Sequence, residues 1–154
     1  MTQRFNPMTS PATAPLIKSL IDYGATVQKA GLEPSLMRLV EIRASQINGC
    51  AMCLEYHTAE ARQQGETEQR IYLLNGWRES SLFSARERAA LEWTEALTKL
   101  HQTGAPDEAY QAMRAQFSDE ESVKLTLMIG VINAFNRVGV GFGVDPARIP
   151  RKAA

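Results

Sequence analysis

Apolar residues recur at helical spacing through most of this 154-residue chain. From Pro15 onward, Leu16, Leu20 and Val27 fall near a period of 3.6 residues, which is typical of an α-helix with one buried face. No stretch alternates apolar and polar residues as a half-buried strand does. The pattern therefore predicts an all-α fold with six to seven helices. They are expected over residues 15–31, 34–48, 50–65, 68–75, 84–101, 106–117 and 118–138.

Several of the expected helix ends carry recognisable signals. Pro34 suits a first turn, where its missing N–H costs nothing. Ser84 and Glu87 form a capping-box pattern, and Ser118 precedes three acidic residues whose charge favours the positive end of a helix dipole. The glycines of residues 139–143 predict a stop and a turn after the last helix, because their spacing does not fit a dinucleotide-binding motif.

The composition fits one globular domain. Apolar residues make up 44% of the chain and charged residues 22%, close to the averages for folded soluble proteins. The 17 basic residues equal the 17 acidic ones, and without a basic patch we expect no nucleic-acid partner. Polar residues interrupt each apolar run before it reaches the length of a membrane span. We therefore expect no membrane partner either.

The ends of the chain differ in composition from its centre. We expect a flexible N-terminal arm at residues 1–14, a helical domain at 15–144 and a loose C-terminal tail at 145–154. The arm is rich in Pro, Thr and Ser and has no apolar secretory segment. This predicts a cytoplasmic protein, in whose reducing surroundings two cysteines are not a structural framework.

Both cysteines lie three residues apart in the segment NGCAMCLEYH, residues 48–57. Residues three apart on a helix have Cα atoms about 5 Å from each other, a separation that a disulfide can span. Asn48 and Gly49 break the preceding helix, so Cys50 is expected at a helix start, where free amides lower the pKa of a thiol. His57 follows Cys53 by one helical turn, so its ring can act as a base toward that sulfur. The segment predicts a redox-active pair of thiols.

Two other interpretations of the cysteines remain open. Both can be small buried apolar residues without chemistry. Alternatively, Cys50, Cys53 and His57 offer three ligands for a structural zinc ion. The other histidine of the chain, His101, stands alone, and the usual second pair of zinc ligands is missing. We therefore expect neither a metal nor an organic cofactor.

The chain resembles the AhpD-like alkylhydroperoxidases of the carboxymuconolactone decarboxylase (CMD) superfamily over residues 15–140. The segments that carry the resemblance are RASQINGCAMCLEYH at 43–57, NGWRES at 75–80, RERAAL at 86–91 and INAFNR at 132–137. The resemblance implies an AhpD-like helical domain whose cysteine pair cycles between dithiol and disulfide. It further implies that a peroxide oxidises Cys53 to a sulfenic acid, and that Cys50 donates a proton and then closes the disulfide. A homo-oligomer, trimeric or hexameric, and a thiol/disulfide redox partner protein are implied as well.

The glutamate that relays protons in the AhpD-like family is not at its usual position in this chain. That glutamate lies twelve residues before the first cysteine, a position that Arg38 holds in this chain, and the nearest acid is Glu41. Glu41 can aim its carboxylate at the same site, or Arg38 can lower a thiol pKa by its charge. A solvated Arg38–Glu41 pair on the surface is the third interpretation. We take Cys50, Cys53, His57 and Glu41 as the candidate catalytic residues.

The expected function is that of a thiol-dependent peroxidase or disulfide oxidoreductase in antioxidant defence, acting on a small-molecule peroxide. One alternative is a lactone decarboxylase of the same fold, which does not need the cysteine pair. Another is a non-catalytic, oligomeric module that senses redox state. The last helix also holds Asn133, Asn136 and Arg137, which need polar partners if they are buried. A subunit interface, the redox site or a solvated helix end can supply them.

Overall fold

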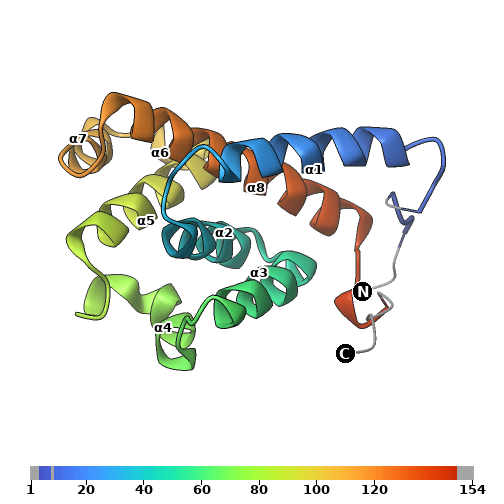
Figure 1. Cartoon of the computed structure of the whole chain (residues 1–154), viewed down its shortest axis with the longest axis horizontal. Helices are drawn as coiled ribbons and strands as arrows, with labels where there is room; N and C mark the ends of the chain where they lie inside the picture. The colour runs from blue at the N-terminus through green and yellow to red at the C-terminus, as the bar shows by residue number, and fades with distance from the viewer. Residues whose placement is uncertain (1–3, 8, 149–154) are drawn as a thin grey trace.

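The computed structural model describes residues 4–7 and 9–148, and this part of the chain is helical with no strands (Figure 1). Along it lie eight α-helices and two short 3-10 helices. These are α1 (Ala14–Gln28), α2 (Pro34–Asn48), α3 (Ala51–Gln63), α4 (Glu68–Leu73), η1 (Leu74–Glu79), α5 (Ala85–Thr98), α6 (Leu100–Thr103), α7 (Asp107–Arg114), α8 (Asp119–Phe142) and η2 (Pro146–Arg148). The all-α prediction is confirmed.

The helix number exceeds six to seven because one expected helix is divided. Lys99 leaves the helical conformation (φ −101°, ψ 31°) and separates α5 from the four-residue α6, where one helix over 84–101 was expected. The last helix also continues through Gly139 and Gly141, so the expected end at residue 138 was wrong. It ends at Gly143, which adopts the left-handed conformation (φ 63°) that glycine tolerates best.

The capping signals were interpreted correctly. Ser84 and Ser118 both accept a hydrogen bond from the backbone three residues on, and the glutamates at those positions complete both capping boxes. The helix expected over residues 68–75 ends as α4 at Leu73, and the 3-10 helix η1 follows it directly. Gly76 departs from helical geometry (φ −109°, ψ 26°), yet η1 runs across it.

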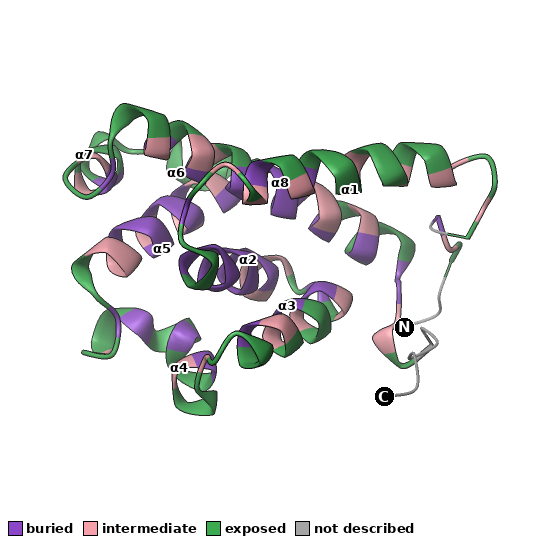
Figure 2. Cartoon of the chain, viewed as in Figure 1, coloured by how far each residue is buried: buried purple, intermediate pink, exposed green. Residues whose placement is uncertain are grey.

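Helix α2 is the centre of the fold. It packs against α3, α5 and α8, and Figure 2 shows it buried over most of its length. Every residue from Leu36 to Ser45 is buried, including Arg38, Glu41 and Arg43. Charged groups in such a place must find partners inside the protein, and those of Arg38 and Glu41 lie beside the cysteine pair.

Helix α8 is the long apolar helix of the core. By length and composition alone it could span a membrane, since an 18-residue stretch has a mean hydropathy of 1.4. In this fold it packs against α1, α2, α3, α5 and α7, and Leu125, Met128, Ile129 and Ile132 are at most 1% exposed. The core position accounts for its apolar character.

The described part of the N-terminal arm touches the end of α8. The backbone N–H of Arg4 donates to the carbonyl of Phe142 (3.1 Å), and its guanidinium donates to the carbonyl of Gly141 (3.1 Å). The rings of Phe5 and Phe142 meet edge to face, with centroids 6.0 Å apart. Most of the expected tail at 145–154 lies outside the described residues.

Candidate active site

The two cysteines lie where α2 gives way to α3. Gly49 ends α2 in the left-handed conformation (φ 66°), which turns the chain so that Cys50 becomes the N-cap of α3. The N–H of Cys50 donates to the carbonyl of Ser45 (3.0 Å), and the N–H of Cys53 donates to Sγ of Cys50 (3.4 Å). The two sulfurs form a disulfide, with Cα atoms 5.4 Å apart. The predicted placement of a bridging pair at a helix start is confirmed.

Gly139 of α8 lets the disulfide lie directly against the helix backbone. A Cβ atom at this position would be 2.7 Å from Sγ of Cys50 and 3.8 Å from Sγ of Cys53. Real Cβ atoms essentially never come as close as the first of these distances. Sequence reasoning assigned Gly139 to a helix stop and missed this contact, because no sequence pattern links it to residue 50.

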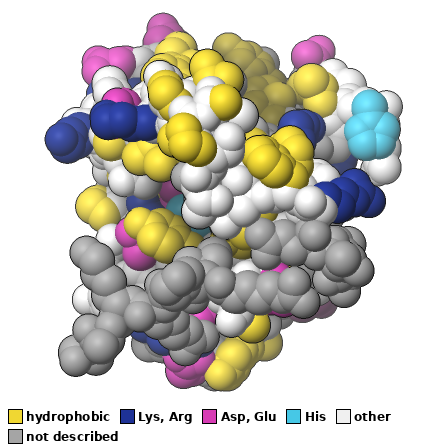
Figure 3. All heavy atoms as spheres, turned by 90° about the vertical axis from the view of Figure 1, so that its right-hand side faces the viewer, with side chains coloured by type: hydrophobic (Ala, Val, Ile, Leu, Met, Phe, Trp, Pro, Cys, Tyr) yellow, Lys and Arg dark blue, Asp and Glu magenta, His cyan; other side chains and the backbone are white. Residues whose placement is uncertain are grey.

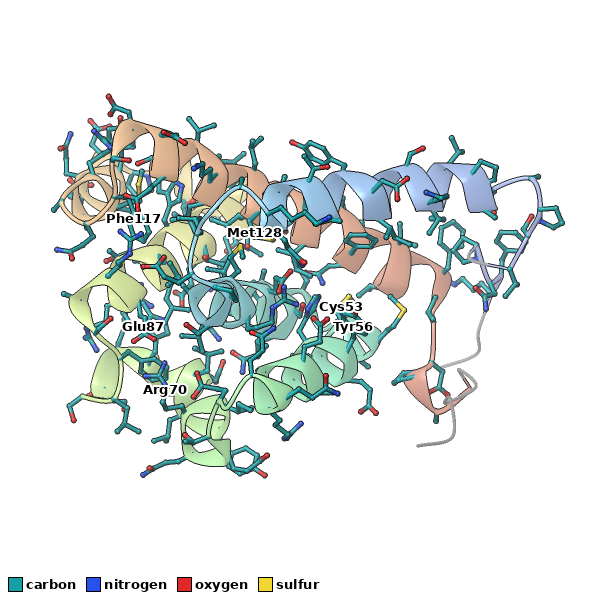
Figure 4. The ribbon with its side chains drawn as sticks, viewed as in Figure 1. Cys53, Tyr56, Arg70, Glu87, Phe117 and Met128 are labelled. Atoms are coloured by element: carbon teal, nitrogen blue, oxygen red, sulfur yellow. A yellow bond between two sulfur atoms is a disulfide. The ribbon has the colours of Figure 1, made fainter. Side chains whose placement is uncertain are left out.

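Cys53 lines a cavity of about 580 Å³ that α1, α3 and α8 enclose, whereas Cys50 does not line it. The walls are mostly apolar, with Ile21 of α1 and Phe135 of α8 among them. Tyr56, labelled beside Cys53 in Figure 4, also lines the cavity and is 59% exposed. Hydrophobic side chains gather on the surface at this end of the molecule (Figure 3). A ligand in this cavity would meet the sulfur of Cys53.

A buried charge cluster closes the inner end of the site. Nη1 of Arg38 lies 3.0 Å from Oε2 of Glu41 and 3.2 Å from Nδ1 of His57, and it also pairs with Glu60. Nδ1 of His57 lies 3.3 Å from Oε2 of Glu41. The side chains of Arg38 and Glu41 are only 5% and 3% exposed. The interpretation of these two residues as a solvated surface pair was therefore wrong.

Burial controls the protonation of the two candidate relay residues. It raises the pKa of Glu41 from 4.5 to about 7, against the opposing charge of Arg38 and a hydrogen bond from Gln28. Burial, and next the positive charge of Arg38, lowers the pKa of His57 to about 3. At neutral pH the imidazole is therefore neutral and the carboxyl exchanges a proton readily. Because a guanidinium only donates, the Arg38 contact is a hydrogen bond in the tautomer of His57 that carries the ring proton on Nε2.

Amide side chains of α8 fix the turn that carries Cys50. Nδ2 of Asn48 donates to Oδ1 of Asn133 (3.0 Å) and of Asn136 (2.8 Å), and Nδ2 of Asn136 donates to Oγ of Ser45 (3.0 Å). Arg137 adds a hydrogen bond to Oδ1 of Asn133 (3.1 Å). Polar partners for these α8 residues were expected at a subunit interface, at the redox site or at a solvated helix end. The structure shows partners beside the redox site.

The structure brings the sequence-predicted site residues together. Cys53, Glu41 and His57 all line the cavity, and Cys50 is joined to Cys53 behind it. His101 lines a different hollow, between α5, α6 and α8. The zinc interpretation is not supported, since both sulfurs are bonded to each other and Nδ1 of His57 faces the charge cluster.

Sequence reasoning missed two polar members of this site. Glu60 follows His57 by three residues, a helical spacing that could have drawn attention to it. Gln28 donates to Oε1 of Glu41 (3.3 Å) from α1. No local pattern relates residues 28 and 41, so only the tertiary structure reveals this contact.

Comparisons with known proteins identify a family and relatives of this chain. The model of the carboxymuconolactone decarboxylase family matches residues 16–96. The uncharacterized protein YdfG of Bacillus subtilis is 39% identical over 127 residues, which make up 82% of this chain and 86% of YdfG.

Solved structures show the same fold. A crystal structure from Agrobacterium tumefaciens matches with a TM-score of 0.89 and 44% identity, over 94% of this chain and 97% of that one. That protein is described as one of unknown function and as a candidate antioxidant defence protein AhpD. An uncharacterized peroxidase-related protein from Silicibacter sp. TM1040 shares the fold, with a TM-score of 0.72 at 19% identity over 95% of both chains.

The family match includes the cysteine pair, His57 and Glu41, and it spans more than half of the 154 residues. The Agrobacterium tumefaciens structure at 44% identity shows the same helical fold. The chain therefore belongs to the carboxymuconolactone decarboxylase family and has an AhpD-like fold.

Proposed function

We propose that this protein is a thiol-dependent peroxidase of antioxidant defence, in which the Cys50–Cys53 pair reduces a peroxide and is then reduced by an external dithiol. The observation that carries the proposal is the position of Cys53, which is bonded to Cys50 and lines an apolar cavity next to a buried acid and a neutral imidazole. The likeness to the candidate AhpD protein from Agrobacterium tumefaciens supports it.

The cavity supports a division of labour between the two cysteines. Helix-start amides favour a thiolate at Cys50, and the Cys53 N–H indeed points at its sulfur. However, Cys53 is the sulfur that lines the cavity, whereas Cys50 lies against Gly139. A substrate in the cavity thus reaches Cys53 first, and we assign the attack on peroxide to Cys53 and the resolving role to Cys50.

The proposed reaction has two oxidation steps. The Cys53 thiolate attacks a peroxide oxygen, the O–O bond breaks, and the leaving alkoxide takes a proton to become an alcohol while the sulfur becomes a sulfenic acid. The Cys50 thiol then attacks that sulfur. The S–S bond forms, the S–O bond breaks, and hydroxide leaves as water with the proton of Cys50. An external dithiol reduces the disulfide and is itself oxidised.

Glu41 and His57 are the proposed proton carriers. Both line the cavity, and Arg38 does not. Glu41 accepts the thiol proton of Cys53 and returns it to the alkoxide, and the neutral imidazole of His57 passes the proton between them. A carboxyl with a pKa of about 7 is well suited to this transfer at neutral pH. In this proposal Glu41 relays the proton, whereas the relay glutamate of the AhpD-like family stands at the position that Arg38 holds here.

The test is steady-state consumption of cumene hydroperoxide with dithiothreitol as the reductant. We expect turnover by the wild type, none by Cys53→Ser, and a single round of sulfenic acid formation by Cys50→Ser. His57→Asn should be slower by roughly 10²-fold through loss of proton transfer. His101→Asn is the matched control and should keep the wild-type rate.

Two further variants separate the relay candidates. Glu41→Gln should slow thiol oxidation by roughly 10²-fold if Glu41 carries the proton. If Arg38 activates the thiol by its charge instead, Arg38→Met should shift the pH profile of alkylation upward while Glu41→Gln has little effect. A wild-type protein that oxidises once but never turns over with the dithiol would instead be a redox sensor.

A further inference from the structure

The guanidinium of Arg38 contacts three titratable side chains of the site. Nη1 of Arg38 contacts Glu41 and Glu60 as well as His57. Nδ1 of His57 lies 3.5 Å from Oε2 of Glu60. With the imidazole neutral, two ionised carboxylates around one cation leave one surplus negative charge in a buried cluster. Such a surplus is costly, so one of the carboxylates holds a proton more readily than an isolated carboxyl does.

The two carboxylates differ in their access to water. The side chain of Glu41 is 3% exposed, whereas that of Glu60 is 30% exposed. An uncompensated charge costs most at the buried Glu41, so the proton of the cluster goes to Glu41. Burial raises the pKa of Glu41, and the negative charge of Glu60 raises it further. Glu60 does not line the cavity, so it acts on the site through Arg38 and Glu41.

We propose that Glu60 is a positioning residue for the relay: it holds Arg38 between two carboxylates and so prevents an exclusive Arg38–Glu41 ion pair that would keep Glu41 permanently ionised. The proposal rests on the proposed function, because it assigns to Glu60 the control of the pH at which Glu41 accepts a proton. It explains why this chain tolerates an arginine so close to its relay acid.

The groups around Glu41 leave few other sources of such control. Arg38 approaches it from α2, His57 and Glu60 from α3, and Gln28 from α1. Tyr56 also interacts electrostatically with Glu41 and Glu60. The α8 side chains that line the cavity are apolar. Among the described residues, Glu60 is therefore the carboxylate that competes with Glu41 for Arg38.

The test compares the pH dependence of Cys53 oxidation in the wild type, Glu60→Gln and Glu60→Asp. Glu60→Gln keeps the shape and removes the charge, so Arg38 then pairs with Glu41 alone. On the acid side of the pH–rate profile, the midpoint should fall by about one pH unit. From a midpoint near 7, this makes Glu60→Gln about fivefold faster than the wild type at pH 6. Glu60→Asp keeps the charge and should restore the wild-type midpoint.

A titration that needs no activity accompanies the kinetics. The side-chain carboxyl of Glu41, labelled with ¹³C and identified by its absence from Glu41→Gln, is followed by NMR in each variant. We expect its midpoint to fall by about one pH unit in Glu60→Gln and to stay unchanged in Glu68→Gln, whose carboxylate pairs with Arg62 at the surface.

An unchanged Glu41 midpoint in Glu60→Gln would overturn the proposal, whatever the rates are. A rate that falls equally at every pH would also overturn it, because that is the behaviour of a merely structural residue. Lack of peroxide turnover in the wild type would contradict the proposed function. The NMR titration would still decide the role of Glu60 in that case.

Discussion

Replacing Glu41 by glutamine should stabilise the protein at alkaline pH. Burial raises the pKa of Glu41 from 4.5 to about 7, so the folded protein binds this proton more tightly than the unfolded chain does. The stability that the bound proton contributes is present at low pH and is lost as the pH rises from 4.5 through 7. The full loss is about 3 kcal/mol, since one pH unit corresponds to about 1.4 kcal/mol. Glu41→Gln has no carboxylate to ionise and escapes the loss.

The measurement is urea denaturation of both oxidised proteins at pH 5 and pH 8. Relative to the wild type, Glu41→Gln should gain about 2 to 3 kcal/mol between these two pH values. His57 remains in both proteins, so its own pH dependence below 6.5 largely cancels from the difference. Glu79→Gln, which replaces an exposed carboxylate, is the control. A stability difference that stays constant from pH 5 to pH 8 would show that Glu41 ionises normally, and the relay argument would then fail.

Three further predictions concern the thiols, the assembly and the disulfide contact. Mild peroxide should remove both reactive thiols by closing an intramolecular Cys50–Cys53 disulfide, and peptide maps with two separately overoxidised cysteines would contradict this. Exposed apolar side chains remain on the described surface, so light scattering should give the mass of three or six chains, and the mass of a single chain would refute the oligomer. Gly139→Val should disfavour the oxidised form by about 1–3 kcal/mol in a glutathione redox titration, because overpacking against Sγ of Cys50 costs that much. Gly141→Val, in open space on the same helix, should leave the redox equilibrium unchanged.

Local signals in the sequence were sufficient for most of the fold. Capping boxes at Ser84 and Ser118 and the turn at Gly49 depend on neighbours within a few residues, and all three were placed correctly. The end of α8 was misplaced because Gly139 and Gly141 resemble a helix stop. Tertiary packing outweighs that weak local preference, since the missing side chain at Gly139 makes room for the disulfide.

The site was predictable where its chemistry lies on one helix. Cys50 caps α3, and Cys53 and His57 lie on it, so their spacing placed them together. The sequence did not show whether Arg38 and Glu41 belong to the site, because a solvated surface pair fits the same spacing. Their burial follows from the central position of α2, which only the packing of the other helices reveals.

The packing of α2 on α8 has a consequence for protein synthesis. Residues 34–57, with both thiols, leave the ribosome before the 119–142 segment that covers them. Domains fold as the chain emerges from its N-terminal end. Here α2 and the cysteine pair lack the helix that packs on them until α8 has been synthesised. The emerging chain thus presents both thiols and the α8-facing side of α2 without their cover until the segment of α8 follows.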